Sequence, residues 1–430
     1  MSRLVHVVGA GLAGLAAAVE AQRRGARVVL HEAAPHAGGR CRSYFDAKLG
    51  VTIDNGGHLL LSGYHATLAY LRAIGSADAL VGPTQPEYPF LDIASGQAWT
   101  IRMSPGRLPR WLFDADARVP ATQPSDYLPM LPLFFAKPGR TIGESMRARG
   151  RVWDRLARPL LRAMLNADPA EASATLAANL LRETVAAGGQ ACRPLVARNG
   201  LAHAFVEPAL RLLQYGGADI RLGARVAGIG YSGTDSKERV SSLAFENASE
   251  PIAVGAGDGV VLAVPPDAAR ALVPGVAAPD EFRASVTVHF AVDVPIAPIA
   301  SASGRLTFFA NGVADCLTAT DDRLTATVAG ADRLLATPHD EIAASVWPEV
   351  AKAARMPTVP MPPWQVVVEP RATFAAVPSQ EGQRCATRTR WPNFTLAGDW
   401  TATGLPATIE GAIRSGQKAV DLLLNPSMER

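Results

Sequence analysis

Residues Leu4 to Glu32 read LVHVVGAGLAGLAAAVEAQRRGARVVLHE, and the strongest fold signal of the chain lies in this stretch. The apolar run Leu4–Val8 predicts a buried β-strand. A glycine-rich turn follows, and helix-forming residues then continue to Arg24. Gly25 stands where a glycine commonly ends a helix, and Ala26–Glu32 predicts a second strand. This spacing is typical of a compact βαβ unit.

The turn in this unit has the glycine spacing of a dinucleotide-binding loop. Gly9 permits the tight turn, Gly11 lets a pyrophosphate approach the backbone, and Gly14 lets the helix pack closely on the strand. The helix start supplies N–H groups and the positive end of its dipole. Glu32 offers a carboxylate to ribose hydroxyls and argues against the 2′-phosphate of NADP. The candidate cofactor-binding residues here are Gly9, Ala10, Gly11, Leu12, Ala13, Gly14 and Glu32.

A second glycine step follows Glu32 closely and helps to choose between NAD and FAD, which the first loop alone does not separate. Gly38 and Gly39 remove side chains from the backbone, and Arg40 adds a forked cation that suits a phosphate. A nicotinamide enzyme has no general need of such a step. FAD binds in an extended form, and a second loop can approach its diphosphate. The pattern therefore favours FAD, with an ordinary turn as the alternative.

These motifs together resemble the signature of a large flavoprotein family that includes monoamine oxidases, protoporphyrinogen oxidases and carotenoid desaturases. The stretch Asn393–Val420, NFTLAGDWTATGLPATIEGAIRSGQKAV, is similar to the C-terminal flavin motif of that family. The resemblance implies that Gly398 and Asp399 meet the phosphate and ribitol of the flavin, and that a helix opens under the isoalloxazine ring. N–H groups at a helix start near Thr408 would stabilise the anionic reduced ring. The candidate residues of this motif are Gly398, Asp399, Pro406, Ala407 and Thr408.

A central part of the chain also matches the family pattern. Gly200–Tyr215 predicts a helix, Gly216–Gly217 predicts its end, and Ala218–Ile229 is strand-like. The resemblance implies that the backbone of Val226 contacts the adenine end of the cofactor. It also implies that Gly259–Pro266 contains the next strand of the flavin domain.

The sequence predicts an α/β fold with two interleaved domains. A chain of 430 residues is too long for one ordinary core, and 48% hydrophobic with 19% charged residues describes a globular protein. We expect a Rossmann-like FAD-binding domain of the GR2 flavoprotein type, as in amine oxidases and desaturases, built from residues 1–75, 195–270 and 385–425. Residues 76–194 and 271–384 are then expected to form an α+β substrate domain.

Within the family, the chain is most similar to the squalene-associated, desaturase-like group of hydroxysqualene dehydroxylases in bacterial hopanoid pathways. The similarity lies in Asp54–Gly75, DNGGHLLLSGYHATLAYLRAIG, in Pro159–Ala174, PLLRAMLNADPAEASA, and in the C-terminal motif. It implies that the substrate is a long apolar isoprenoid alcohol, hydroxysqualene, and that the product is squalene. Replacing an allylic C–OH by C–H needs an acid for the leaving hydroxyl, a hydride from reduced flavin, and a dry apolar pocket.

The resemblance implies that the segment after the diphosphate loop approaches the flavin ring, so the acid is sought there. His58 is the first candidate for the catalytic acid, and Asp54 and Tyr64 are the other candidates, with His65 in the same segment. Gly56 and Gly57 are expected to contact the cofactor. As an alternative, His58 hydrogen-bonds to backbone and shapes the Gly56–Gly57 turn, while Asp54 holds it.

Other polar residues favour structural roles. His289 lies in an apolar strand-like run, where a hydrogen-bonded core histidine is the favoured interpretation. Glu369 and Arg371 flank a proline and are interpreted as an ion pair. No His or Cys spacing predicts a metal site, and the four cysteines form no CxxC pair, which fits a reducing compartment.

Two other catalytic functions and one non-catalytic function remain open from the sequence. A carotenoid or phytoene-type desaturase would share the fold and the flavin but would move hydride from substrate to flavin. The resemblance implies that an amine oxidase of this family would use a lysine to hold water at the flavin. No lysine lies between Lys237 and Lys352, so amine oxidation is disfavoured. The non-catalytic function is that of a protein that binds flavin in a membrane or in a protein complex without turnover. No second dinucleotide unit is present, so reduction is expected from an unidentified external partner or from transient nicotinamide binding.

The region between Ile101 and Leu165 suggests contact with a membrane. It holds twelve Lys or Arg against five Asp or Glu, a net charge of +7 in a chain whose total is +3. Trp111–Phe113 and Leu131–Phe135 add bulky apolar side chains, which suit an anionic membrane surface; a solvated face over core residues is the alternative. Without a nucleic-acid motif or an apolar run of roughly 18 residues, we expect a cytoplasmic protein, peripheral on the inner face of the cytoplasmic membrane.

Overall fold

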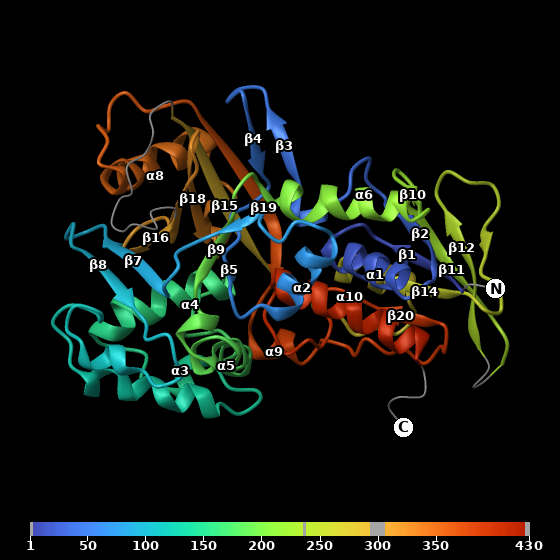
Figure 1. The fold of residues 1–430 in the computed structure, drawn as a ribbon, viewed down its shortest axis with the longest axis horizontal. Coiled ribbons are helices and arrows are strands. Elements are labelled where there is room, and N and C mark those ends of the chain that lie inside the picture. Colours follow the sequence, from blue (N-terminus) through green and yellow to red (C-terminus); the bar gives the residue numbers. More distant parts are fainter. Residues whose placement is uncertain (1–2, 235–237, 293–305, 426–430) are drawn as a thin grey trace.

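The computed structural model describes residues 3–234, 238–292 and 306–425 (Figure 1). The opening stretch forms β1 (Leu4–Val8), α1 (Leu12–Arg23) and β2 (Arg27–His31), so the predicted βαβ unit is present. Gly25 has φ +82°, the left-handed conformation that a helix-ending glycine adopts. The apolar strand residues are buried because both faces of the sheet are covered.

A five-stranded parallel sheet joins three distant parts of the chain. Its strand order is β10-β2-β1-β14-β20, and every neighbouring pair is parallel. The carboxyl ends of β1 and β2 therefore lie beside one another at one edge, where ligands of open α/β sheets bind. The strands not yet bounded are β10 (Asp219–Arg221), β14 (Gly259–Leu262) and β20 (Phe394–Leu396).

The strand-like run Ala218–Ile229 is split in the structure, which corrects its interpretation as one strand. A turn with Gly223 at φ +69° separates β10 from β11 (Val226–Ser232), and the two strands enter different sheets. The second sheet is antiparallel and consists of β11, β12 (Arg239–Phe245) and β13 (Ile252–Ala253).

A seven-stranded mixed sheet forms the other half of the molecule, in the order β19-β15-β18-β17-β16-β7-β8. Helix α8 (His339–Ala354) covers one face of this sheet (Figure 1), and an apolar cluster fills the space between them. The side chains of Ser285, Thr287, His289, Thr325 and Thr327 alternate with those apolar residues and so lie on the other face. The strands are β7 (Glu87–Asp92), β8 (Ala98–Arg102), β15 (Phe282–Ala291), β16 (Leu306–Ala310), β17 (Cys316–Ala319), β18 (Arg323–Ala329) and β19 (Trp364–Phe374).

Helices and short hairpins connect the two halves. Two small antiparallel sheets contain β3 (Ser43–Asp46) with β4 (Val51–Asp54), and β9 (Pro194–Ala197) between β5 (Leu60–Leu61) and β6 (Leu80–Val81). The remaining helices are α2 (His65–Ala73), α3 (Ile142–Ser145), α4 (Arg158–Leu165), α5 (Ala174–Glu183), α6 (Glu207–Tyr215), α7 (Pro266–Leu272), α9 (Pro378–Glu381) and α10 (Ile409–Leu424).

Helices α1 and α10 lie side by side (Figure 1), which brings the N-terminal and C-terminal motifs together. A Cβ on Gly416 would lie 2.1 Å from the carbonyl oxygen of Ala13, so only a glycine allows this close packing.

The two large sheets use different parts of the chain. Every strand of the parallel sheet falls within residues 1–75, 195–270 and 385–425, and every strand of the seven-stranded sheet falls within 76–194 and 271–384. The exact domain boundaries remain a prediction.

Candidate active site

One cavity of about 710 Å³ is lined by residues of both large sheets and of helices α1, α4 and α10. Its nucleotide part contains the glycine loop at the end of β1 and the ends of β2 and β14. Its second part is largely apolar and lies against the seven-stranded sheet and α4. The residues of that apolar part are Leu59, Ala163, Met164, Val196, Leu306, Cys316 and Thr318.

The three glycines of the first loop have three different surroundings. A Cβ on Gly9 would lie 2.4 Å from the oxygen of Ala263, and one on Gly14 would lie 1.8 Å from the oxygen of Gly9. A Cβ on Gly11 would meet no atom within 4 Å in the described part of the chain and would project into the cavity. Gly9 and Gly14 are therefore required by packing, whereas Gly11 keeps space open in front of the N-terminus of α1.

The second glycine step lies directly beside the first loop. The backbone N–H of Gly38 donates to the oxygen of Ala10 at 2.8 Å, and Gly38 and Gly39 have φ values of +108° and +54°. These left-handed conformations favour glycine at both positions. Two stretches of bare backbone thus form neighbouring walls of the same trough, which is the arrangement that the sequence predicted.

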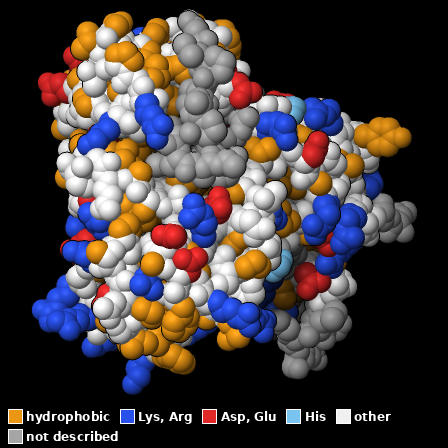
Figure 2. Space-filling view, turned by 60° about the vertical axis from the view of Figure 1, so that its left-hand side comes forward, with side chains coloured by type: hydrophobic (Ala, Val, Ile, Leu, Met, Phe, Trp, Pro, Cys, Tyr) orange, Lys and Arg blue, Asp and Glu red, His pale blue; other side chains and the backbone are white. Residues whose placement is uncertain are grey.

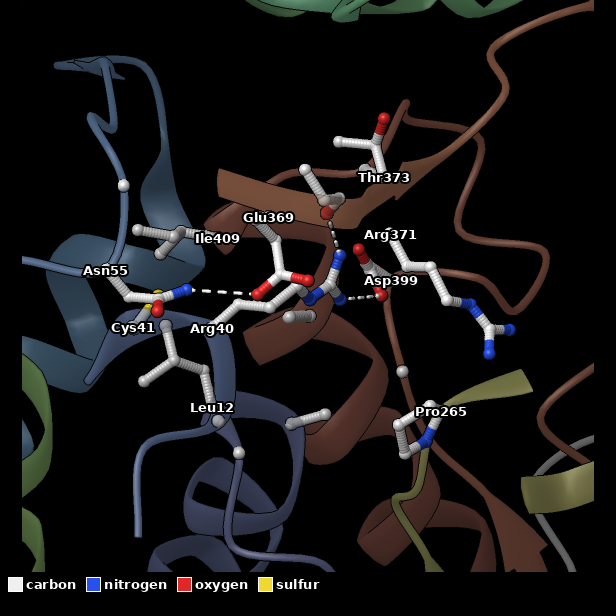
Figure 3. Close-up of a pocket in the computed structure, with 18 of the residues that line it drawn as sticks. Leu12, Arg40, Cys41, Asn55, Pro265, Glu369, Arg371, Thr373, Asp399 and Ile409 are labelled. Carbon is white, nitrogen blue, oxygen red and sulfur yellow. Dashed lines mark hydrogen bonds and ion pairs between the residues drawn. The ribbon is translucent and has the colours of Figure 1, made fainter. Parts of the chain in front are cut away.

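Arg40 and Asp399 contact each other at the centre of this trough (Figure 3). Arg40 Nη2 donates to Asp399 Oδ1 at 2.7 Å, and Nη1 donates to the oxygen of Ala372 at 2.6 Å. Attraction by Asp399 raises the pKa of Arg40 above its ordinary value. The sequence predicted both residues near the phosphates and ribitol but did not predict that they pair with each other, since 359 positions separate them.

The nucleotide end of the trough is held by Glu32. Its Oε2 accepts from the N–H of Ala10 at 2.7 Å, and its Oε1 accepts from the N–H of Ala34 at 2.8 Å. These bonds fix the carboxylate at the end of β2, while Val226 lines the cavity at the start of β11. Both residues line the same end of the cavity, and their contacts with the ribose and the adenine end of the cofactor stay a prediction.

The C-terminal motif closes the trough from the other side. The Oγ1 of Thr408 accepts from the N–H of Gly411 at 3.0 Å and caps α10, so the helix starts where the sequence predicts. Of the motif residues, Gly398, Asp399, Ala407 and Thr408 line the cavity, and Pro406 is not among the described lining residues.

Asp54 is committed to the scaffold. Its Oδ1 accepts from Ser43 Oγ at 2.5 Å and from the N–H of Leu201 at 2.8 Å, and its backbone oxygen lies 3.1 Å from His289 Nε2. Asp54 is also not among the described residues that line the cavity. This geometry favours the alternative interpretation, in which Asp54 holds local structure rather than supplies a proton.

His58 lines the cavity but is poorly suited to act as an acid. Its Nδ1 lies 3.0 Å from the oxygen of Gly56, so the Nδ1–H donates to the backbone of the Gly56–Gly57 turn. This is the alternative role that the sequence allows for His58. Burial lowers the pKa of His58, which favours the neutral ring. Its Nε2 lies 4.0 Å from Cys41 Sγ, and burial raises the pKa of that thiol to about 12. The pair is therefore not a thiolate–imidazolium pair.

Tyr64 and the neighbouring glycines lie against the cavity from the flavin side. Tyr64 is buried at the start of α2, and burial raises the pKa of its phenol. His65 is the first residue of α2 and does not belong to the described lining residues. Gly56 and Gly57 line the cavity, and a Cβ on Gly57 would lie 2.2 Å from Thr327 Oγ1. The loop before His58 thus packs directly onto the seven-stranded sheet.

The remaining polar predictions have mixed outcomes. His289 is buried in β15 and lies 3.0 Å from Thr325 Oγ1, so it is a hydrogen-bonded core histidine as interpreted. The interpretation of Glu369 and Arg371 as an ion pair is wrong. Arg371 pairs with Asp267 at 2.8 Å and is directed away from Glu369, which accepts from Asn55 Nδ2 at 3.1 Å (Figure 3). Side chains two positions apart in a strand lie on the same face, which made an ion pair between Glu369 and Arg371 plausible. The long side chain of Arg371 instead reaches Asp267 on α7.

Comparison with known proteins identifies the family. A family model described as flavin containing amine oxidoreductase matches residues 12–424. The chain is 47% identical over 424 residues to hydroxysqualene dehydroxylase of Rhodopseudomonas palustris, with 99% of each chain covered. It is 46% identical over 427 residues to hydroxysqualene dehydroxylase of Sinorhizobium fredii, again with 99% of each chain covered. The chain belongs to the hydroxysqualene dehydroxylase family of flavin-containing amine oxidoreductases.

The fold agrees with this family. The solved structure of cyclohexylamine oxidase from Brevibacterium oxydans matches with a TM-score of 0.68 over 100% of both chains, at 18% sequence identity. At that identity the likeness concerns the fold alone. The predicted Rossmann-like flavoprotein fold and the predicted family are thus confirmed.

As a hydroxysqualene dehydroxylase family member, the chain uses a flavin cofactor, and the trough fits one. The open space in front of Gly11 and the start of α1 suits a diphosphate. Two neighbouring glycine loops and the Arg40 cation lie beside it. These features are independent of the family match and point to the same group.

Sequence reasoning missed Arg384, which supports the loop of Asp399 without being among the described residues that line the cavity. Its buried guanidinium donates to the backbone oxygens of Asp399, Thr401 and Leu405 and to Thr403 Oγ1. It thereby holds the loop that carries Asp399. Three arginines precede the C-terminal motif, at positions 384, 388 and 390, and the sequence gives no sign that the first of them is buried, since arginines are mostly solvated side chains.

Proposed function

We propose that this protein is an FAD-dependent oxidoreductase that removes the hydroxyl group of hydroxysqualene and gives squalene. The observation that carries the proposal is one cavity that joins a dinucleotide trough to an apolar pocket, in a chain nearly half identical to named hydroxysqualene dehydroxylases. An isoprenoid chain needs such an apolar pocket, and its reaction needs the flavin beside it.

FAD would be held by residues from three parts of the chain. Glu32 accepts from the ribose hydroxyls, and the backbone around Gly11 and the N-terminus of α1 contact the diphosphate. Arg40 and Asp399, already paired at 2.7 Å, would meet the diphosphate and the ribitol of a bound FAD. Bound in its reduced form, the flavin supplies a hydride to the substrate carbon.

The chain itself orients the alcohol, excludes water and supplies a proton. The apolar residues Leu59, Met164 and Leu306 exclude water from the reacting carbon. This matters because water would recapture an allylic cation and regenerate the alcohol. A hydroxyl group leaves far more readily as water, so an acid of the chain must protonate it or hydrogen-bond to it.

The direct test is an anaerobic single turnover. The flavin of the purified protein is reduced chemically, hydroxysqualene is added, and flavin absorbance and product mass are followed together. We expect reoxidation of the flavin with one squalene formed per flavin. If reduced flavin ignores the alcohol while phytoene bleaches oxidised flavin, the protein is a desaturase and the proposal is wrong.

We also propose that the basic and apolar region at residues 101–165 contacts an anionic membrane, from which the substrate is collected. Figure 2 shows hydrophobic side chains gathered at the lower end of the molecule, with Lys and Arg around them. Phe113 and Phe135 are 78% and 80% exposed, and the other exposed apolar side chains of this region are Leu108, Leu128 and Leu131. No helix of the described residues is long and apolar enough to cross a bilayer. Bulky apolar side chains with basic neighbours suit insertion at the interface.

A further inference from the structure

The cavity contains five described carboxylates, and four of them have clear other roles. Glu32 is bound to backbone at the nucleotide end, and Asp399 is paired with Arg40. Asp267 pairs with Arg371, and Glu369 stands beside Asn55 and Arg40 in the cofactor trough (Figure 3). The fifth carboxylate is Asp315, which precedes β17 and lies next to the apolar part of the cavity.

We propose that Asp315 is the acid that protonates the departing hydroxyl, with Arg162 as its positioning residue. This inference rests on the proposed function and names a residue for it. Asp315 takes the role of the acid, whereas His58 and Asp54 keep a structural role. Their hydrogen bonds hold the loops on the flavin side.

The position of Asp315 is fixed by the sheet and by α4. Its N–H donates to the oxygen of Thr327 at 2.8 Å, its Oδ2 accepts from the N–H of Ala329 at 2.7 Å, and its Oδ1 lies 3.1 Å from Arg162 Nε. Thr327 is also the residue on which Gly57 packs. Asp315 is therefore hydrogen-bonded to the residue through which the flavin-side loop contacts the sheet.

The surroundings of Asp315 suit a carboxyl that can both hold and release a proton. The side chain is 9% exposed, and burial raises its pKa to about 6 although Arg162 opposes this shift. The charged groups that face it are Arg162 from α4, Glu349 from α8 and Arg333 after β18. Once the proton has left, the carboxylate is stabilised by Arg162 and by the N–H of Ala329.

The reaction balances with one proton and one hydride. The proton of the Asp315 carboxyl moves to the hydroxyl oxygen of hydroxysqualene, the C–O bond breaks, and its electron pair leaves with water. The carbon, now cationic or nearly so, forms a C–H bond with the hydride that the reduced flavin supplies, so carbon is reduced and flavin is oxidised. The Asp315 carboxylate faces the developing cation and is reprotonated from solvent.

The test compares Asp315→Asn with a matched control, Glu349→Gln. Glu349 is a buried carboxylate that holds the same hairpin through the N–H groups of Val313 and Ala314, but it is not among the described residues that line the cavity. In the anaerobic single turnover of hydroxysqualene, we expect Asp315→Asn to be at least about 100-fold slower than wild type, with flavin content unchanged. Glu349→Gln removes a charge that faces Asp315 but leaves its carboxyl in place, so at pH 5, where that carboxyl is protonated, the rate should stay within a few-fold of wild type.

The pH dependence gives a second readout, which a merely structural role would not move. Because the acid must be protonated, the wild-type rate should fall as the pH rises through about 6, and Asp315→Glu should keep this fall with a shifted midpoint. A wild-type rate that is independent of pH from 5 to 8, or Asp315→Asn turning over as wild type does, overturns the assignment and leaves the proposed function standing. If wild-type protein forms no squalene, the proposed function and the assignment of Asp315 both fail. If Asp315→Asn does not fold, the profiles of wild type and Asp315→Glu decide.

Discussion

Gly11 and Asp315 line the same cavity but belong to two different kinds of wall. Around Gly11 the wall is backbone: two glycine loops, a helix start, and a carboxylate held by N–H groups. Around Asp315 the wall is made of side chains from the seven-stranded sheet and α4, which are far apart along the chain. The first wall has the glycine spacing of a general nucleotide site, whereas the second is built from side chains that local spacing does not dictate.

Spacing along the chain governs the backbone wall, whereas individual side chains govern the other wall. The backbone wall has no room for a side chain at Gly9 and Gly14, and a side chain at Gly11 would fill the space that the wall keeps open. A side-chain wall tolerates many substitutions of similar volume, and its chemistry depends on one or two polar groups. Substitutions in the two walls should therefore fail in different ways.

The largest effect is expected at Gly14. A Cβ there would lie 1.8 Å from the oxygen of Gly9, which is backbone and cannot move without breaking the turn. Gly14→Val should abolish folding of the parallel sheet, so that little soluble protein is recovered. Yield and circular dichroism measure this, and a soluble variant with native helix content would contradict the packing argument.

Gly11→Val is the matched substitution in the same loop and should fail differently. A Cβ at this position meets no atom within 4 Å in the described part of the chain, so we expect the apoprotein to fold and melt as wild-type apoprotein does. The side chain occupies the diphosphate position, so flavin affinity should fall by at least about 100-fold. Flavin fluorescence titration measures this, and normal flavin retention would show that the loop has been misassigned.

These two glycines also explain how much could be predicted from the sequence. The nucleotide wall depends on residues within about 30 positions of one another, so spacing alone predicts the strands, the helix and the loop. The pairing of Arg40 with Asp399 joins residues 359 positions apart, and no local pattern reports it. Asp315 follows a similar logic, because its role depends on burial against α4, which a single sequence does not show.

Acid should loosen the contact between strand β4 and the seven-stranded sheet through His289. This ring lies between Asp54 on the flavin side and Thr325 in the sheet, and burial lowers its pKa from 6.5 to about 4. Since the unfolded chain binds the proton first, the stability is fully present above pH 6.5 and is lost as the pH falls toward 4. The shift corresponds to at most about 3 kcal/mol.

Urea unfolding at pH 7.5 and 4.5 measures this loss. His289→Gln should be less stable than wild type at pH 7.5 and should lose less stability at pH 4.5. His203→Gln is the control, because His203 is 53% exposed and its substitution should keep the wild-type pH dependence. Equal losses in wild type and His289→Gln would remove His289 from this role.

Arg40→Ala should have a smaller effect on the nucleotide wall than Gly11→Val. The substitution removes the cation beside the diphosphate and leaves Asp399 without its partner, but it leaves both glycine loops in place. Flavin affinity should fall by about 10- to 30-fold. Arg40→Lys should recover part of it, because it restores charge without the fork. A variant that purifies with a full complement of flavin would show that Arg40 has another role.

The smallest effect concerns the way that substrate reaches the side-chain wall. Phe135→Asp removes one exposed apolar side chain from the basic region and adds a negative charge, so flotation with vesicles of phosphatidylserine and phosphatidylcholine should fall by about 3- to 5-fold. Tyr215→Asp is the control, because Tyr215 is 94% exposed on α6 and lies outside this region. Turnover of detergent-dispersed hydroxysqualene should be unchanged in both variants, since neither residue lines the cavity as described. Equal flotation of the two variants would separate the basic region from membrane binding, and a parallel loss of turnover in detergent would instead connect Phe135 with the structure of the pocket.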